Sequence, residues 1–173
     1  PSFMAAANDL SAMLINQRQY DASLLRPFVG ANAPEVVNIN QLIALLNEGQ
    51  YVSADSVAQF ITDKASTHTM LAVNAVFNGR YEASYATIAK TSLRNEVVML
   101  LTMKRNEDAL RMSRKLPDGE AVSHYLRAIC LNRTNDPTEA YNELKKSFEM
   151  DASLREIAKG DGDVTDLLSM DKQ

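Results

Sequence analysis

The side chains best suited to chemistry in this 173-residue sequence are two histidines and one cysteine. Glu120 and His124 are four residues apart, so on a helix they share one face and could hold a metal ion between them. A structural metal site needs about four protein ligands, and the sequence has no second pair with this spacing. We therefore interpret Glu120 and His124 as forming a hydrogen bond or ion pair at the protein surface.

Cys130 is the other candidate for covalent chemistry. It lies six residues after His124, on a different face of any helix that carries both, so the two cannot form a nucleophile–base pair within that helix. We predict that Cys130 is a small core residue and that His68 packs or caps near the start of a helix. The sequence has no phosphate-binding glycine loop and no nucleophile elbow. It predicts no catalytic residue, no metal and no cofactor.

Three acidic residues near the C-terminus, Asp161, Asp163 and Asp166, raise the question of calcium binding. A calcium-binding loop of the EF-hand kind needs a glycine and a closing glutamate at fixed positions, and this stretch lacks that order. Aspartate is also a preferred residue at the N-terminal end of a helix. We interpret the stretch as a turn in which Asp163 caps a short helix over residues 165–169.

The segments that carry these residues have the periodicity of helices. Apolar residues recur at helical spacing, and no segment shows sustained alternation with a period of two. Ser92 is suited to cap a helix, whereas Pro27 must shorten or kink the segment before it. We predict an all-α fold. The helices with clear bounds cover residues 3–16, 20–26, 35–47, 53–64 and 153–158.

A turn motif recurs along the chain at a spacing of roughly thirty residues. It reads Gly79-Arg80-Tyr81 in one copy and Gly49-Gln50-Tyr51 in another, and a small residue follows each tyrosine three positions later. The glycine suits the end of a helix, and the small residue lets two helix backbones approach closely. The small residues expected at these close contacts are Ala54, Ser84, Ala109 and Ala140.

A repeat of this length predicts an α-solenoid of about five antiparallel helix pairs, forming a single domain over residues 1–173. Its boundaries follow from the turn motif and from the proline and glycine residues between segments. The predicted repeat units cover residues 3–30, 34–64, 66–91, 92–116 and 120–152, and residues 153–173 form a C-terminal capping segment.

The turn motif resembles that of tetratricopeptide repeats, which place Gly, then Tyr two residues on, then Ala three residues after that. Gly49, Tyr51 and Ala54 match this order. The resemblance implies a right-handed superhelix whose concave face binds a peptide or a partner helix. The positions that would line this face are Thr69, Val73 and Val76 in one unit and Tyr125, Ile129 and Asn132 in another. Members that hold a carboxylate tail have Lys and Asn at the first two of these positions, so tail capture is not expected here.

Composition narrows the classes of partner. The net charge is −4, from 18 basic and 22 acidic residues, and no block of Lys and Arg offers the charge density that nucleic acid needs. No apolar run is long enough to span a membrane. Residues 144–168 resemble the ends of repeat regions in bacterial envelope proteins. Because the chain begins with Pro1, we expect a processed product or a piece of a longer protein, periplasmic or outer-membrane-associated rather than cytoplasmic.

These features predict a non-catalytic scaffold that binds another protein through a peptide or a partner helix. The first alternative is a structural spacer or oligomerisation module of a larger envelope protein, which would form a homo-oligomer through its own exposed apolar faces. A helical-repeat hydrolase is a minor alternative.

Overall fold

The computed structural model of the protein describes residues 3–172. Within these residues the chain forms ten α-helices and one 3-10 helix, and no strand. The predicted all-α fold is therefore confirmed. No helix in the described part of the chain is long and apolar enough to cross a membrane.

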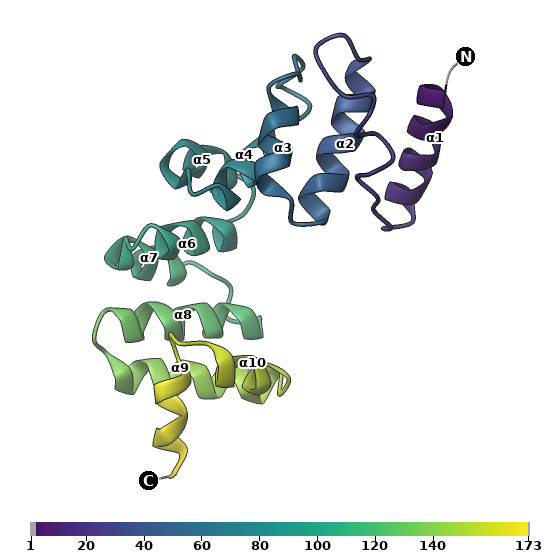
Figure 1. Cartoon of the computed structure of the whole chain (residues 1–173). Coiled ribbons are helices and arrows are strands. Elements are labelled where there is room, and N and C mark those ends of the chain that lie inside the picture. The colour runs from purple at the N-terminus through teal and green to yellow at the C-terminus, as the bar shows by residue number, and fades with distance from the viewer. Residues whose placement is uncertain (1–2, 173) are drawn as a thin grey trace. The chain divides into compact units, whose positions relative to one another are not determined.

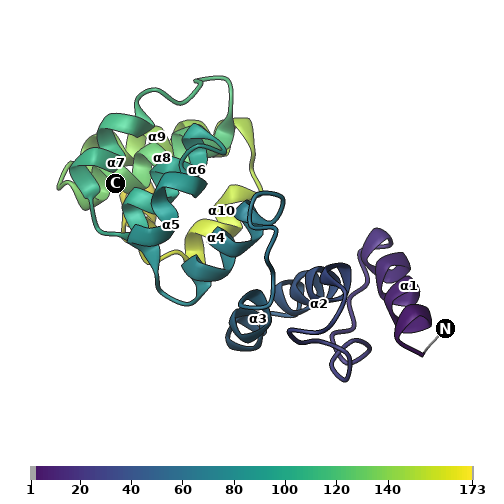
Figure 2. The same ribbon diagram turned by 90° about the horizontal axis from the view of Figure 1, so that it is seen from above.

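The chain divides into two compact units, one ending at Thr87 and the other beginning at Ile88. In the first unit α2 packs on α1 and on α3, and in the second α8 packs along α9 and α7 (Figures 1 and 2). The helices up to residue 88 are α1 (Phe3–Asn16), α2 (Glu35–Asn47), α3 (Tyr51–Ala58), α4 (His68–Phe77) and α5 (Tyr81–Ile88). Those that follow are α6 (Leu93–Thr102), α7 (Asn106–Ser113), α8 (Ala121–Arg133), α9 (Pro137–Met150), α10 (Leu154–Gly160) and the 3-10 helix η1 (Thr165–Lys172).

Five helices end in the same backbone turn. After α4, the Gly79 amide donates to Val76 O at 2.9 Å and the Arg80 amide donates to Ala75 O at 2.8 Å, with Gly79 at φ 77°. This pair of bonds is the Schellman motif, which satisfies carbonyl groups that the end of a helix leaves free. The same two bonds close α1, α2, α6 and α8. The left-handed residues are Arg18, Gly49, Gly79, Lys104 and Asn135.

A small residue lies buried shortly after four of these turns. Ala54, Ala109 and Ala140 are 0% exposed and Ser84 is 1% exposed, and each lies in the helix that follows its turn. The Ser84 hydroxyl donates to Arg80 O at 2.8 Å, so its burial leaves no donor unsatisfied. The predicted burial of small residues between helices is confirmed.

The helix predicted over residues 20–26 is wrong, because this stretch forms a series of turns. The Asp21 carboxylate accepts hydrogen bonds from the backbone amide and the hydroxyl of the serine two residues on, a local bonding pattern that competes with a helix. Pro27 removes a further backbone donor. The turn is fixed from α2, where Gln41 Nε2 donates to the Ala22 oxygen at 2.9 Å.

The other predicted bounds hold with small changes. Residues 3–16 and 35–47 are helices as expected, and α3 begins and ends earlier than the predicted 53–64. Ser92 caps α6 as predicted, because its Oγ accepts a hydrogen bond from the Asn95 amide at 3.1 Å. The segment expected over residues 153–158 is α10.

The left-handed turns give a matched test of backbone strain. Replacing Gly79 with Ala should lower the free energy of unfolding by about 1 kcal/mol, because a Cβ disfavours positive φ. Replacing Lys104, at φ 59°, with Gly should relieve the same strain and raise that free energy by about 1 kcal/mol. Urea unfolding followed by circular dichroism measures both changes.

Gly119 is the control, because it has no positive φ and a Cβ there would meet nothing within 4 Å. Gly119→Ala should cause no loss of stability. Equal losses for Gly79→Ala and Gly119→Ala would contradict the role given to the turn.

Candidate functional site

The six residues predicted to line a binding face lie on two helices, one in each unit. In each helix the three residues stand at the same distances before the left-handed residue that follows, so the two sets are equivalent in position. Their spacing of three and four residues places each set on one side of its helix. They are Thr69, Val73 and Val76 on α4, and Tyr125, Ile129 and Asn132 on α8.

On α8, Tyr125 and Ile129 are each 7% exposed and Asn132 is half-buried. Residues 161–168, which we call the tail segment, follow α10 and lead into η1. The Tyr125 hydroxyl donates to Asp161 Oδ2 at 2.9 Å, and Asn132 Nδ2 donates to the Asp163 backbone oxygen at 2.8 Å. Burial of the Tyr125 ring, and then its hydrogen bond to Asp161, raise the pKa of the hydroxyl, so it remains a donor at neutral pH.

Arg133 is a further contact that the sequence did not reveal. Its Nε donates to Asp163 Oδ1 at 2.8 Å and its Nη2 donates to Asp163 Oδ2 at 2.6 Å, a bidentate pair. Its Nη1 donates to the Leu101 backbone oxygen of α6 at 2.8 Å. The one available signal was a positive charge directly after Asn132 in a chain whose tail carries several aspartates. We call Tyr125, Ile129, Asn132 and Arg133 together the α8 face.

The tail aspartates act differently from the prediction. Asp163 was expected to cap the helix that begins at Thr165, and its two carboxylate oxygens instead accept from Arg133. Asp161 accepts from the Asp163 amide at 3.0 Å through Oδ1, and Asp166 accepts from Asn132 at 3.1 Å. In the described residues no group of three or more His, Cys, Asp or Glu side chains is arranged to hold a metal ion.

The equivalent face of α4 is more open. Thr69 is exposed, and Val73 and Val76 are half-buried. On the same helix Phe77 is 56% exposed, and its ring stacks on Tyr51 of α3 with the ring centroids 4.1 Å apart.

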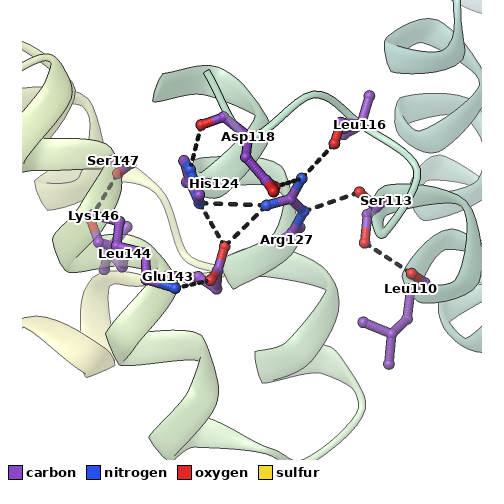
Figure 3. A network of polar contacts seen from close by, with 10 residues as sticks. All are labelled: Leu110, Ser113, Leu116, Asp118, His124, Arg127, Glu143, Leu144, Lys146 and Ser147. Atoms are coloured by element: carbon purple, nitrogen blue, oxygen red, sulfur yellow. Dashed lines mark hydrogen bonds and ion pairs between the residues drawn. The ribbon is translucent and has the colours of Figure 1, made fainter. Parts of the chain in front are cut away.

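A buried polar cluster joins α8 to α9 and to the turn before α8 (Figure 3). His124, Arg127 and Glu143 are 7%, 8% and 6% exposed. His124 Nδ1 lies 2.7 Å from Glu143 Oε2, and Lys146 Nζ donates to Glu143 Oε1 at 2.6 Å. His124 Nε2 lies 2.9 Å from the backbone oxygen of Asp118.

Arg127 connects this cluster to the segment between α7 and α8. Its guanidinium donates to the backbone oxygens of Ser113 and Leu116 and pairs with the Asp118 carboxylate at 2.7 Å. Its Nη1 also lies 3.4 Å from Glu143 Oε2. Every polar group of the guanidinium is therefore used to hold backbone or a carboxylate in place, as burial of a charge requires.

The charges of the cluster follow from these contacts. Burial raises the pKa of the Glu143 carboxyl, but hydrogen bonds from Lys146 and His124 act the other way and leave that pKa below its usual value. An ionised Glu143 can only accept hydrogen bonds, and so can the Asp118 carbonyl. One ring nitrogen of His124 faces each of these two acceptors.

The sequence-based interpretations of the reactive residues have mixed outcomes. Cys130 is 0% exposed and burial raises the pKa of its thiol to about 11, so the predicted core role is confirmed. The prediction that Glu120 and His124 pair with each other is wrong. Glu120 pairs with Arg94 instead, while His124 is buried. His68 is the first residue of α4 and its Nε2 lies 2.8 Å from the Thr87 hydroxyl oxygen.

Each unit has a hollow beside polar residues. The first has a volume of about 500 Å³ and is lined by Lys64, Leu71 and the Asp55–Arg80 ion pair, whose closest contact is 2.6 Å. The second, of about 280 Å³, borders Arg127 and Glu143.

Comparison of the chain with models of protein families, with curated proteins and with solved structures gave no match. The likeness to tetratricopeptide repeats therefore stays a prediction made from the turn motif.

The buried contacts of Arg127 predict that truncating its side chain destabilises the fold. Arg127→Ala should lower the free energy of unfolding by about 3 kcal/mol or more, because it leaves Glu143 and two backbone oxygens short of a buried donor. The matched control is Arg111→Ala, which removes an arginine whose side chain is 68% exposed and pairs with Asp108. That change should cost less than about 1 kcal/mol. Similar costs in urea unfolding would contradict the cluster's structural role.

The lowered pKa of the Glu143 carboxyl predicts that the free energy of unfolding depends on pH. Because its folded-state pKa lies below the unfolded value near 4.5, its contribution is present above that value and is lost as pH falls through the folded-state pKa. Glu143→Gln should therefore be less stable at pH 7 and lose stability less steeply on acidification, by up to about 1.4 kcal/mol per pH unit. Urea unfolding between pH 3 and 7 tests this, and parallel curves for the two proteins would contradict it.

Proposed function

We propose that the chain is a non-catalytic, tetratricopeptide-like α-solenoid of paired helices that binds a peptide or partner helix of another protein on its concave face. The observation that carries this proposal is the contact between the α8 face and the tail segment. Tyr125 and Asn132, chosen from the repeat pattern as binding positions, hold a segment of chain through a hydroxyl and an amide. At the same positions on α4, Thr69 is exposed and Val73 and Val76 are half-buried.

The α4 face has the composition expected of such a site. Val73 and Val76 offer half-buried aliphatic surface, and Thr69 is exposed beside them with a hydroxyl that can fix the register of a ligand. Apolar contact supplies affinity in helix-in-groove and peptide complexes, and polar groups at the rim supply orientation.

The buried cluster supports a binding function over a catalytic one. His124 and Arg127 contact backbone oxygens and the Glu143 carboxylate, so the polar groups that could act on a substrate hold α8, α9 and the preceding turn together. Cys130, with its raised thiol pKa, is a poor nucleophile. We therefore propose no catalytic residues for the hydrolase alternative.

The spacer or oligomerisation alternative rests on α1. Phe3, Leu10 and Met13 are 90%, 40% and 49% exposed and recur at helical spacing, so they form an apolar row. Elsewhere on α1, Asn8 accepts a hydrogen bond from Asn40 of α2 and Ser11 is buried. This row could pack against a second copy of the chain.

Site-specific photo-crosslinking separates the two functions. A photoreactive residue at Thr69, used in an extract of the cells that make the protein, should form a discrete crosslink to another protein. Ser53 of α3 is the control position, because it is also exposed and stands outside the proposed face. Val73→Glu should reduce the Thr69 crosslink at least about tenfold, since a buried charge in an apolar contact weakens binding by more than 1.4 kcal/mol.

Two results would count against partner binding. Equal crosslinks from Thr69 and Ser53 would mean that the α4 face is not selective. Crosslinks only between copies of the chain would favour the oligomerisation alternative.

A further inference from the structure

We propose that the α8 face is a recognition site for an acidic–apolar peptide segment of a partner protein, and that the tail segment is a tethered occupant which such a peptide replaces. This inference rests on the proposed binding function and names the chemistry of the ligand. The tail segment would then compete with the partner peptide for the α8 face.

The polar contacts specify acceptors on the ligand. The α8 face presents three donors along one helix: the Tyr125 hydroxyl, the Asn132 amide and the Arg133 guanidinium. Each is met by an oxygen of the tail segment, and those from Tyr125 and Arg133 go to carboxylates. A ligand for this face must therefore carry acidic side chains, because a buried or partly buried donor left unpaired costs free energy.

Arg133 is held in position independently of the tail segment. Its Nη1 donates to the Leu101 oxygen at 2.8 Å, which leaves Nε and Nη2 directed at the Asp163 carboxylate. A donor fork that is fixed beforehand loses less conformational freedom when a carboxylate binds. The guanidinium is thus a preorganised carboxylate site rather than a side chain recruited by the tail.

The apolar contacts specify the rest of the ligand. Val164 is 0% exposed and Leu167 is 1% exposed, and η1, which contains Leu167, packs on α9 and α10. The order Asp161-Gly162-Asp163-Val164, followed by Asp166-Leu167, thus alternates carboxylates that pair with α8 and aliphatic side chains that are buried. A partner segment with two acidic residues flanking a Val, and a Leu three residues later, offers the same chemistry.

The packing of α8 makes replacement of the tail feasible. α8 packs mainly along α9 and α7, and its buried cluster of His124, Arg127 and Glu143 makes no bond to the tail segment. The pair that anchors the tail is partly solvated, with Arg133 and Asp163 side chains each 30% exposed. Loss of the tail contacts therefore leaves the main supports of α8 in place.

Competition sets the affinity that an experiment should find. A segment on a short tether acts at an effective concentration on the order of mM, and a free peptide binds only the fraction of molecules whose site is open. The intact chain should bind a free copy of the segment weakly. A chain whose own tail is weakened should bind it more tightly.

The test uses the full chain and a fluorescent synthetic peptide with the sequence of residues 160–169, measured by fluorescence anisotropy. The double substitution Asp163→Asn and Leu167→Ala should tighten peptide binding at least tenfold relative to the unaltered chain. Arg133→Ala added to that variant should weaken binding at least tenfold. Arg111→Ala added instead should leave binding unchanged, because Arg111 pairs with Asp108 on α7.

Circular dichroism shows whether the double variant is still folded. If the double variant loses helicity, Asp163→Asn alone provides the open site, with the same expected direction and the same Arg133 control. Binding that is equally weak in the folded variant and the unaltered chain would overturn the proposal, because the tail would then be a fixed part of the fold. Binding that ignores Arg133→Ala would also overturn it, and so would a dimer in light scattering in place of peptide binding.

Failure of this proposal is distinguishable from failure of the proposed function. The Thr69 crosslink reports on the α4 face, in the other unit of the chain, and does not involve the tail segment. A Thr69 crosslink without peptide binding at α8 would retain the binding function and reject only the tethered-occupant inference.

Discussion

A residue in the left-handed conformation ends each of five helices, and the course of the chain depends on this repeated constraint. The turn closes two hydrogen bonds to the end of the helix and redirects the backbone within two residues. The position of the next contact follows, since a small residue a fixed distance later is buried against a neighbour. Glycine satisfies the constraint at Gly49 and Gly79, whereas Arg18, Lys104 and Asn135 meet it with a side chain and its steric cost.

In each unit, polar side chains on helices form hydrogen bonds with backbone groups of irregular segments, which in a helix would bond to one another. Gln41 on α2 and Arg127 on α8 stand at the same distance before their left-handed residues, and each donates to a backbone oxygen of the preceding irregular segment, that of Ala22 or Leu116. Asn38 similarly bonds the amide and the oxygen of Gly30, each at 3.1 Å. Irregular segments can therefore stay buried with their backbone groups satisfied.

Local pattern was enough to predict much of the fold. The turn at Gly79 depends on residues within one helical turn, so the sequence carries its signal directly, and the burial of Ala54 could be predicted because a small residue recurs five positions after the left-handed residue. The stretch over residues 20–26 has an apolar pattern that suits a helix, and its outcome is decided by the Asp21 carboxylate and by a bond from α2. That bond joins residues 19 positions apart in the sequence, so no local spacing of residues predicts it.

The contacts made by the candidate site residues could not be predicted from the sequence. Repeat register led us to Tyr125 and Asn132 as binding positions, which remains a prediction; their hydrogen bonds to the tail segment, and the Arg133–Asp163 pair across a sequence separation of 30 residues, have no local signal in the sequence. His124 shows the same limit. Its spacing from Glu120 suggested a surface pair, whereas its partner is Glu143 on the next helix, 19 residues away.

The account's central claim is that the α8 face holds the tail segment by matching a fixed arginine to an aspartate. A double-mutant cycle between Arg133→Ala and Asp163→Ala, measured by urea unfolding, tests this contact without reference to any ligand. The two side chains are each 30% exposed, so we expect a coupling energy of about 1 kcal/mol, at the upper end for a partly solvated pair. Strictly additive losses, with no coupling, would mean that Arg133 does not hold the tail and would contradict the account.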